Sequence, residues 1–247
     1  MTPEDMLHRL LHRDGLMLVV DKPAGIAVHK GPKGGACVED HFHALRFGLP
    51  RDPALAHRLD RDTSGCLVLG RHRKALEKLG LLFRQGKIGK TYWAVVDGHP
   101  DGDEGLIDLG LSTLEPGRGW WMKPDPAGLP SQTRWRVLGR GAAADGAPIA
   151  FVRFEPLTGR THQIRVHAAA QGWPVRGDPI YGRGKEPGAP PLQLHAREVV
   201  VPLPKHEPTR VTAPVPPHMR DALASCGWED APHSGHQAAN TGAGRNG

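Results

Sequence analysis

The sequence predicts a mixed α+β fold built on a largely antiparallel sheet. Short runs rich in β-branched, aromatic or alternating apolar residues dominate the middle of the chain, separated by turns rich in Gly, Pro and Asp. Segments with apolar residues at helical spacing flank these runs. No internal repeat and no clear boundary divides the chain before its last 19 residues. We therefore expect residues 1–228 to form one domain.

Length and composition indicate a globular protein. The chain has 247 residues, of which 38% are hydrophobic and 23% charged, which excludes a fibrous protein. No apolar run is long enough to cross a membrane, and the N-terminal segment is unlike a signal peptide, so we expect a cytoplasmic protein. Cys37, Cys66 and Cys226 lie far apart without metal-binding spacing. They predict reduced thiols, with neither a disulfide nor a zinc site.

The first elements are a short helix and a buried strand. Thr2 is suited to cap a helix, and Pro3 suits its first position. An apolar stripe that begins at Met6 and runs to Leu11 predicts an amphipathic helix. The apolar run from Leu16 to Val20 then predicts a strand that ends in a Pro/Gly turn.

The middle of the chain adds a second buried strand, a helix and a series of further strands. Cys66 to Leu69 is the strand, and Leu and Phe at helical spacing predict a helix over Arg73 to Gln85, which Gly86 ends. The further strands are expected at Thr91 to Val96, Gln132 to Leu138 and Ile149 to Glu155.

The C-terminal part contains two more helices around a strand pair. Thr161 is suited to cap a helix from His162 to Gln171, which Gly172 ends. A strand pair is expected around Leu192 to Val201, and a last short helix over Pro217 to Cys226.

Charge suggests a polyanionic partner. Lys and Arg number 32 against 26 Asp and Glu, a formal net charge of +6. Residues 229–247 almost lack large apolar side chains, which predicts a disordered tail. Because that tail holds few charges, the basicity belongs to the folded part, as in proteins that bind nucleic acid.

The densest polar segment runs from His57 to Gly65, directly before an apolar strand. It combines two carboxylates, three basic side chains and two hydroxyls, as an active-site loop does. The alternative is a solvated turn in which Thr63 and Ser64 cap backbone amides. Residue types alone do not choose between Asp60 and Asp62.

A second polar segment extends from Leu157 to His167. His162 and Arg165 are three residues apart and would share one face near a helix N-terminus, which favours anions. Arg165 could meet a phosphate or a protein carboxylate there, or simply extend from a surface helix. His162 and His167 are five apart, which does not match a two-histidine metal motif.

A third segment leads from Lys87 into an aromatic strand. Lys90 and Tyr92 together are typical of sites that bind unpaired nucleotides, because aromatic rings stack on bases and Lys binds phosphate. The alternative is a strand tyrosine that packs in the core.

Several of these motifs together resemble a known family. His57-Arg58-Leu59-Asp60 with Thr63-Ser64-Gly65 is similar to the HRLDxxTSG signature of the RluA-type pseudouridine synthases, with seven fixed positions in nine residues. The other similar elements occur in family order between about residues 16 and 217; they are Asp21-Lys22-Pro23-Ala24-Gly25 with Val28-His29, Lys90-Thr91-Tyr92, Thr158 to His167, Gly177-Asp178-Pro179 with Tyr181-Gly182, and Leu194-His195-Ala196.

The resemblance implies a pseudouridine synthase fold: a central, mostly antiparallel mixed sheet with flanking helices and a catalytic cleft. It implies isomerisation of specific uridines to pseudouridine in structured RNA, a stem-loop of 23S rRNA or tRNA, without cofactor or metal. Asp60 would be the catalytic aspartate, Tyr92 would pack against the target base, and Arg165 would pair with Asp60. Arg58 matches the arginine that fills the space left by the flipped nucleotide. The other residues expected to contact RNA are His57, Thr63, Lys90, Arg160 and His162.

Many relatives carry an RNA-binding domain of S4 type ahead of the catalytic domain. Only about 15 residues precede the first family element here, too few for a domain. We therefore expect the basic face of the catalytic domain to bind RNA, which favours compact stem-loops. A monomer without an obligate protein partner is the default expectation.

Three other functions compete with this interpretation. The first is a non-catalytic RNA-binding protein that retains the fold, against which the complete signature with Tyr92 and Arg165 argues. The second is a hydrolase that pairs Ser64 with His162, but the chain lacks a GxSxG elbow. The third is covalent catalysis by Cys66, which lies in an apolar run typical of a core.

Overall fold

The computed structural model describes residues 1–31, 34–114, 120–203 and 207–230. Its helices are α1 (Pro3–His8), the 3-10 helix η1 (Val38–Leu45), α2 (Arg73–Arg84), α3 (Gln163–Ala170) and α4 (Pro217–Ser225). Its strands are β1 (Leu10–Arg13), β2 (Met17–Lys22), β3 (Ala54–Leu55), β4 (Ser64–Gly70), β5 (Gly89–Asp97), β6 (Glu104–Asp108), β7 (Leu111–Thr113), β8 (Met122–Pro124), β9 (Gln132–Ala142), β10 (Pro148–Pro156), β11 (Leu194–Val201) and β12 (Thr209–Thr212).

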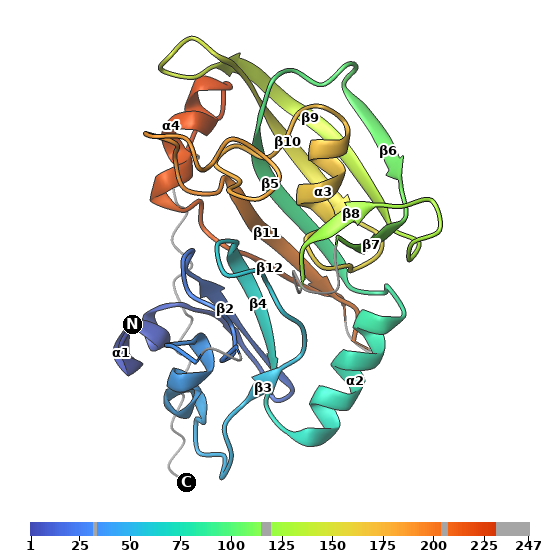
Figure 1. Cartoon of the computed structure of the whole chain (residues 1–247). Coiled ribbons are helices and arrows are strands. Elements are labelled where there is room, and N and C mark those ends of the chain that lie inside the picture. Colours follow the sequence, from blue (N-terminus) through green and yellow to red (C-terminus); the bar gives the residue numbers. More distant parts are fainter. Residues whose placement is uncertain (32–33, 115–119, 204–206, 231–247) are drawn as a thin grey trace, which may run out of the picture.

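One ten-stranded sheet runs through the described part of the chain (Figure 1). Its main path is β1-β2-β4-β11-β5-β10-β9-β6, while β12 pairs with β11 and β3 with β4. Among the described pairs, β4 with β11 is parallel and the others are antiparallel. The predicted α+β fold with a mostly antiparallel mixed sheet is confirmed.

The parallel pair joins the two parts of the sheet. It places Ser64 beside His195 and Gly65 beside Ala196. The backbone of Gly65 has φ +103°, and a Cβ there would lie 2.3 Å from the carbonyl oxygen of Ala196. Glycine therefore permits both this conformation and this close approach of the strands.

Separate apolar clusters pack on either side of this junction. On one side β2 and β4 pack against η1, with Val20, Leu67 and Phe42 buried. On the other side β5 and β10 pack against α3. Tyr92 contacts both clusters, so its ring lies where the two parts of the sheet meet.

The helix at the N-terminus is shorter than the sequence predicts. Thr2 forms the expected capping box with Asp5, but α1 ends at His8. Leu10 belongs instead to β1, where it pairs with Val20. Strand pairing with β2 thus overrides the helical spacing of the leucines.

The start of α3 also differs from the prediction. The residue at its N-cap is His162, with φ 54° in the left-handed region and no capping side-chain hydrogen bond, so Thr161 is not the cap. The predicted ends of α2 and α3 are correct to within one residue, and Gly86 and Gly172 follow them with positive φ. The predicted last helix matches α4 to within one residue.

No helix in the described ranges has the length and apolar character needed to span a bilayer. Of the tail predicted at 229–247, residues 231–247 lie outside the part of the chain that the structure describes.

Candidate active site

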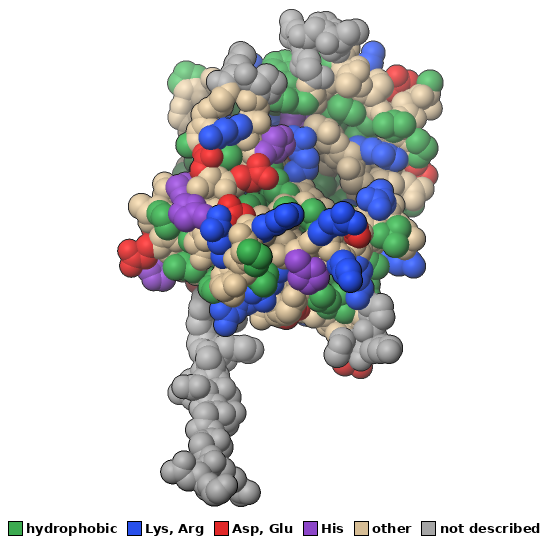
Figure 2. All heavy atoms as spheres, turned by 90° about the horizontal axis from the view of Figure 1, so that it is seen from below, with side chains coloured by type: hydrophobic (Ala, Val, Ile, Leu, Met, Phe, Trp, Pro, Cys, Tyr) green, Lys and Arg blue, Asp and Glu red, His purple; other side chains and the backbone are tan. Residues whose placement is uncertain are grey.

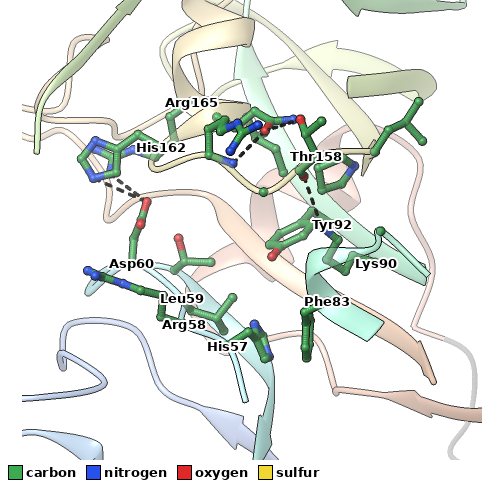
Figure 3. Close-up of a pocket in the computed structure, with 18 of the residues that line it drawn as sticks. His57, Arg58, Leu59, Asp60, Phe83, Lys90, Tyr92, Thr158, His162 and Arg165 are labelled. Atoms are coloured by element: carbon green, nitrogen blue, oxygen red, sulfur yellow. Dashed lines mark hydrogen bonds and ion pairs between the residues drawn. The ribbon is translucent and has the colours of Figure 1, made fainter. Parts of the chain in front are cut away.

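A cavity of about 580 Å³ opens where the two parts of the sheet meet. The loop before β4, the end of α2, the start of β5 and the segment leading into α3 contribute its walls (Figure 3). All nine predicted site residues line it: His57, Arg58, Asp60, Thr63, Lys90, Tyr92, Arg160, His162 and Arg165.

The structure separates the two aspartates of the polar loop. Asp60 lines the cavity, its side chain is 25% exposed, and its Oδ2 lies 3.2 Å from Nη1 of Arg165 and 3.7 Å from Nε2 of His162. Asp62 is not among the lining residues, and its ion pair is with exposed Arg61 at 3.8 Å. The geometry that an active carboxylate needs is therefore found at Asp60.

Arg165 is held from behind by a buried carboxylate. Its Nε and Nη2 donate to Asp178 at 2.7 and 2.8 Å, and the two side chains are 4% and 0% exposed. Burial alone would lower the pKa of Arg165, but its hydrogen bonds with Asp178 and the charges of Asp178 and Asp60 raise it above its usual value. Arg165 is thus a fixed cation, with Nη1 directed at Asp60.

Asp178 is a site residue that the analysis of residue types did not single out. Burial alone would raise the pKa of its carboxyl, but hydrogen bonds from Arg165 and from the backbone N–H groups of Ile180 and Tyr181 lower it. The signal in the sequence was its place in the Gly177-Asp178-Pro179 element.

The loop that carries Asp60 is tied down by a buried lysine. Nζ of Lys22, which is fully buried, donates to the carbonyl oxygens of Pro23, Ile26 and Arg61, each at 2.8 Å. The Gly25 N–H also donates to the Arg61 carbonyl. Burial lowers the pKa of Lys22 to about 7, although the neighbouring aspartates oppose this shift. These bonds fix the backbone next to Asp60 before any substrate arrives.

Tyr92 and Lys90 lie across the cavity from Asp60 (Figure 3). Burial raises the pKa of Tyr92 and the charge of Asp60 adds to this, so the phenol stays protonated near neutral pH. Nζ of Lys90 donates to the Thr158 carbonyl at 3.2 Å. Tyr92 thus offers a neutral aromatic face, and Lys90 a cation at the cavity wall.

His57 forms part of the wall beneath this end of the cavity. Its Nε2 accepts the N–H of Val68 at 3.0 Å, and its ring stacks on Phe83 at 4.5 Å between centroids. Burial lowers the pKa of His57 to about 3, so the ring is neutral. His57 therefore contributes to the shape of the site and carries no charge there.

Thr63 is also buried, and its N–H donates a hydrogen bond to the carbonyl oxygen of Asp60, which closes the turn between them.

The mouth of the cavity is basic. Arg58 and Arg160 are exposed there, together with Arg84 and, next to the cavity, Lys87. Within the described residues Arg58 makes no ion pair, so its guanidinium is available to a ligand. Figure 2 shows Lys and Arg side chains gathered across the middle of the face seen from below. Such a surface suits a polyanion.

The geometry does not support the rival nucleophiles. The Oγ of Ser64 is buried and hydrogen-bonds to Nδ1 of His195 at 2.9 Å, rather than to His162. Cys66 is buried, and burial raises the pKa of its thiol to about 12. In the described ranges, no three His, Cys, Asp or Glu side chains lie close enough together to hold a metal ion.

Comparison with known proteins identifies the family of this chain. Residues 16–170 match the model of the RNA pseudouridylate synthase family. This chain belongs to that family. The assignment makes the protein an RNA pseudouridine synthase, an isomerase, and supports the catalytic interpretation over a non-catalytic RNA-binding protein.

Individual relatives of this pseudouridine synthase cover most of its length. An uncharacterized RNA pseudouridine synthase of Zymomonas mobilis is 39% identical over 215 residues, which cover 86% of this chain and 96% of the relative. Ribosomal large subunit pseudouridine synthase C of Vibrio cholerae is 36% identical over 231 residues, or 89% and 69% of the two chains. The solved structure of human RNA pseudouridylate synthase domain containing 1 aligns with a TM-score of 0.72 at 30% identity and covers 87% of this chain and 86% of that one.

Proposed function

We propose that Asp60 is the catalytic carboxylate of this pseudouridine synthase and that Arg165 and Tyr92 act beside it. The observation that carries the proposal is the contact between Asp60 and Arg165 inside a cavity walled by an aromatic side chain. A volume of about 580 Å³ is within the range of sites that enclose small ligands or one extruded nucleotide. The neutral ring of Tyr92 offers a face for the uracil.

The reaction moves the uracil from one glycosidic bond to another. The N1–C1′ bond breaks and a C5–C1′ bond forms. C5 loses its hydrogen to solvent as a proton and N1 gains a proton, so the product is an isomer. Asp60 acts in its ionised form, either by attack on carbon or by abstraction of a ribose proton. The guanidinium of Arg165 donates a charge-assisted hydrogen bond to that carboxylate at 3.2 Å and holds it in place.

A uridine within a folded RNA must leave its stack before Asp60 can reach it. Extrusion costs a few kcal/mol in unstacking and unpairing, which the enzyme offsets with new contacts. The exposed guanidinium of Arg58 suits insertion into the space that the base leaves. Lys90 and Arg160 suit contacts with the flanking phosphates, while His57, Thr63 and His162 shape the pocket that receives the base.

The proposed substrate is a stem-loop of ribosomal or transfer RNA. The basic mouth of the cavity supports a folded RNA whose phosphates pass close to the flipped base. The name of the Vibrio cholerae relative supports the large ribosomal subunit as one source. Comparing 23S rRNA with tRNA transcripts decides between these sources.

The proposed working form is a monomer in the cytoplasm. It fits a site in which the contact between Asp60 and Arg165 is made within the chain, so a second copy is not needed to assemble it. We expect light scattering to give the mass of one chain both alone and with a bound RNA stem-loop. A stable dimer in either state contradicts this part of the proposal.

Tritium release tests the catalytic assignment. RNA labelled with tritium at C5 of uracil loses its label when the C5 glycoside forms, so release measures the reaction directly. We expect the wild type to release tritium from one of the two transcripts, and Asp60→Asn to release none while it still binds RNA. The isosteric amide removes the charge and leaves the shape of the pocket.

Asp62→Asn is the matched control, since it makes the same change two residues away and outside the cavity. We expect it to retain most of the activity. If instead Asp62→Asn abolishes release and Asp60→Asn does not, the assignment of Asp60 is wrong.

A further inference from the structure

The turn after Asp178 contacts both partners of Asp60. The carboxylate of Asp178 holds Arg165, and the hydroxyl of Tyr181 lies 2.8 Å from Nδ1 of His162. The Tyr181 ring also lies 5.3 Å from Cζ of Arg165, a cation–π distance. One short turn therefore organises the two groups that face Asp60.

The direction of the hydrogen bond between Tyr181 and His162 follows from its surroundings. The oxygen of Tyr181 accepts the N–H of Met122 at 2.8 Å. Among the described residues, Nδ1 of His162 is the one acceptor within reach of the phenolic proton. Tyr181 therefore donates to Nδ1, and the proton of the neutral ring lies on Nε2.

The opposite tautomer conflicts with the charges around the ring. The charged groups that face His162 are Asp60, Arg165, Asp178 and Arg58. With the proton on Nδ1, the Nε2 lone pair would point at the carboxylate of Asp60 from 3.7 Å, while the proton of Tyr181 would lack an acceptor. Burial lowers the pKa of His162, which keeps the ring neutral with a single N–H.

The backbone of His162 supports the same arrangement. Its φ of 54° is uncommon for a residue other than glycine, and such conformations persist where the surrounding structure determines them. Here the ring is held between Tyr181 and Asp60, and its side chain is 7% exposed.

Both contacts of Asp60 reach the same carboxylate oxygen. Nη1 of Arg165 and Nε2 of His162 face Oδ2, and Oδ1 has no partner among the described residues. The 3.7 Å distance is longer than a hydrogen bond, as is common before substrate binds, and it can shorten when the pocket closes on a base.

We propose that Tyr181 is a positioning residue that holds His162 in its Nε2–H tautomer, so that His162 and Arg165 together hold Oδ2 of Asp60 and leave Oδ1 to react. This inference rests on the proposed role of Asp60. Tyr181 itself acts through His162 and does not touch the substrate.

The test begins with the wild-type protein labelled with ¹⁵N-histidine. Ring nitrogen shifts distinguish the two tautomers, and the His162 signal is identified by its loss in His162→Asn, since Asn tolerates the left-handed conformation. We expect the Nε2–H pattern in the wild type and a mixture of tautomers in Tyr181→Phe. An Nδ1–H pattern in the wild type overturns the proposal. Because no RNA is present, this result does not depend on the proposed function.

Kinetics provide the second arm. Tyr181→Phe keeps the ring over Arg165 and loses only the hydroxyl, so we expect the single-turnover rate at saturating RNA to fall about tenfold while the Kd for RNA stays unchanged. In the His162→Asn background the same change should cost nothing further, because Tyr181 acts through His162. An equal loss in both backgrounds, or a wild-type rate for Tyr181→Phe, overturns the proposal. A wild type that releases no tritium contradicts the proposed function instead.

Discussion

The floor and the rim of the cavity are built in different ways. The floor residues His162 and Arg165 are buried and hydrogen-bonded. Behind them, buried Asp178 is paired with Arg165, and buried Lys22 holds the loop of Asp60. The rim residues, Arg58, Arg84, Lys87 and Arg160, are exposed. A fixed floor keeps the reacting carboxylate in one geometry. The side chains around it are ordered when the protein folds, so they do not need to rearrange during the reaction. An exposed rim can follow the path of an RNA backbone. The comparison predicts that floor variants change stability and rate, whereas rim variants change affinity.

The largest effect is expected where the floor loses its buried ion pair. Arg165→Met leaves the carboxylate of Asp178 buried without its cation, so we expect the free energy of unfolding to fall by about 3–5 kcal/mol. Urea denaturation followed by circular dichroism measures this loss.

Arg183→Met is the matched control, since the pair between Arg183 and Glu186 is also made by a guanidinium but is exposed. Solvent screens exposed pairs, so we expect Arg183→Met to lose far less stability than Arg165→Met. Equal losses in the two variants would remove the distinction between a buried floor and a solvated surface.

A pH-dependent effect, smaller within any one pH unit, is expected from His57 in the cavity wall. Its pKa is about 3 in the folded protein and about 6.5 when unfolded, so between these values the unfolded chain binds a proton that the folded chain does not. Stability from this group is complete above pH 6.5 and falls as the pH drops toward 3, by up to about 1.4 kcal/mol per unit. We expect His57→Gln to have a shallower slope of unfolding free energy against pH.

Exposed His8 provides the comparison for this slope. The variant His8→Gln should keep the wild-type dependence on pH. If His57→Gln also keeps it, the ring of His57 is not held neutral by its burial and its bond from Val68.

The smallest effect is expected on the rim and concerns RNA binding alone. Lys87→Ala removes one exposed cation beside the cavity, so we expect weaker RNA binding. The slope of log K for RNA binding against log salt concentration should be smaller in magnitude by about 1. Filter binding over a series of salt concentrations measures it, and stability should stay within about 0.5 kcal/mol of the wild type.

Arg220→Ala on α4 serves as the control, because this exposed arginine lies on another element and does not line the cavity. Its salt slope should equal that of the wild type. A reduced slope in Arg220→Ala would extend the RNA-binding surface beyond the rim.

Much of the site could be predicted because it is carried by short contiguous motifs. The segments around Asp60, Tyr92 and Arg165 each combine chemistry with a strand or helix start, and the sheet brings them to one cavity. The main strands were also predictable, since their alternating or continuous apolar runs match the burial that the structure gives them.

The features that the sequence patterns did not predict depend on contacts between residues far apart in the chain. Spacing alone placed Leu10 in a helix, because pairing with β2 is a tertiary effect. His162, in the left-handed conformation, is hydrogen-bonded to Tyr181, which follows 19 residues later. The choice of Asp60 over Asp62 from residue types likewise required Arg165, 105 residues away.

The parallel pairing of β4 with β11 also determines when the enzyme becomes complete during its synthesis. Ser64, which directly follows the Asp60 loop, is 131 residues ahead of its neighbour His195. At 5–20 residues per second, a ribosome needs roughly 7 to 26 seconds to make the intervening chain. Until then β4 lacks its neighbour in the centre of the sheet, and the cavity lacks the wall that Leu194 contributes. A nascent chain therefore displays its basic segments to RNA well before it holds a finished pocket.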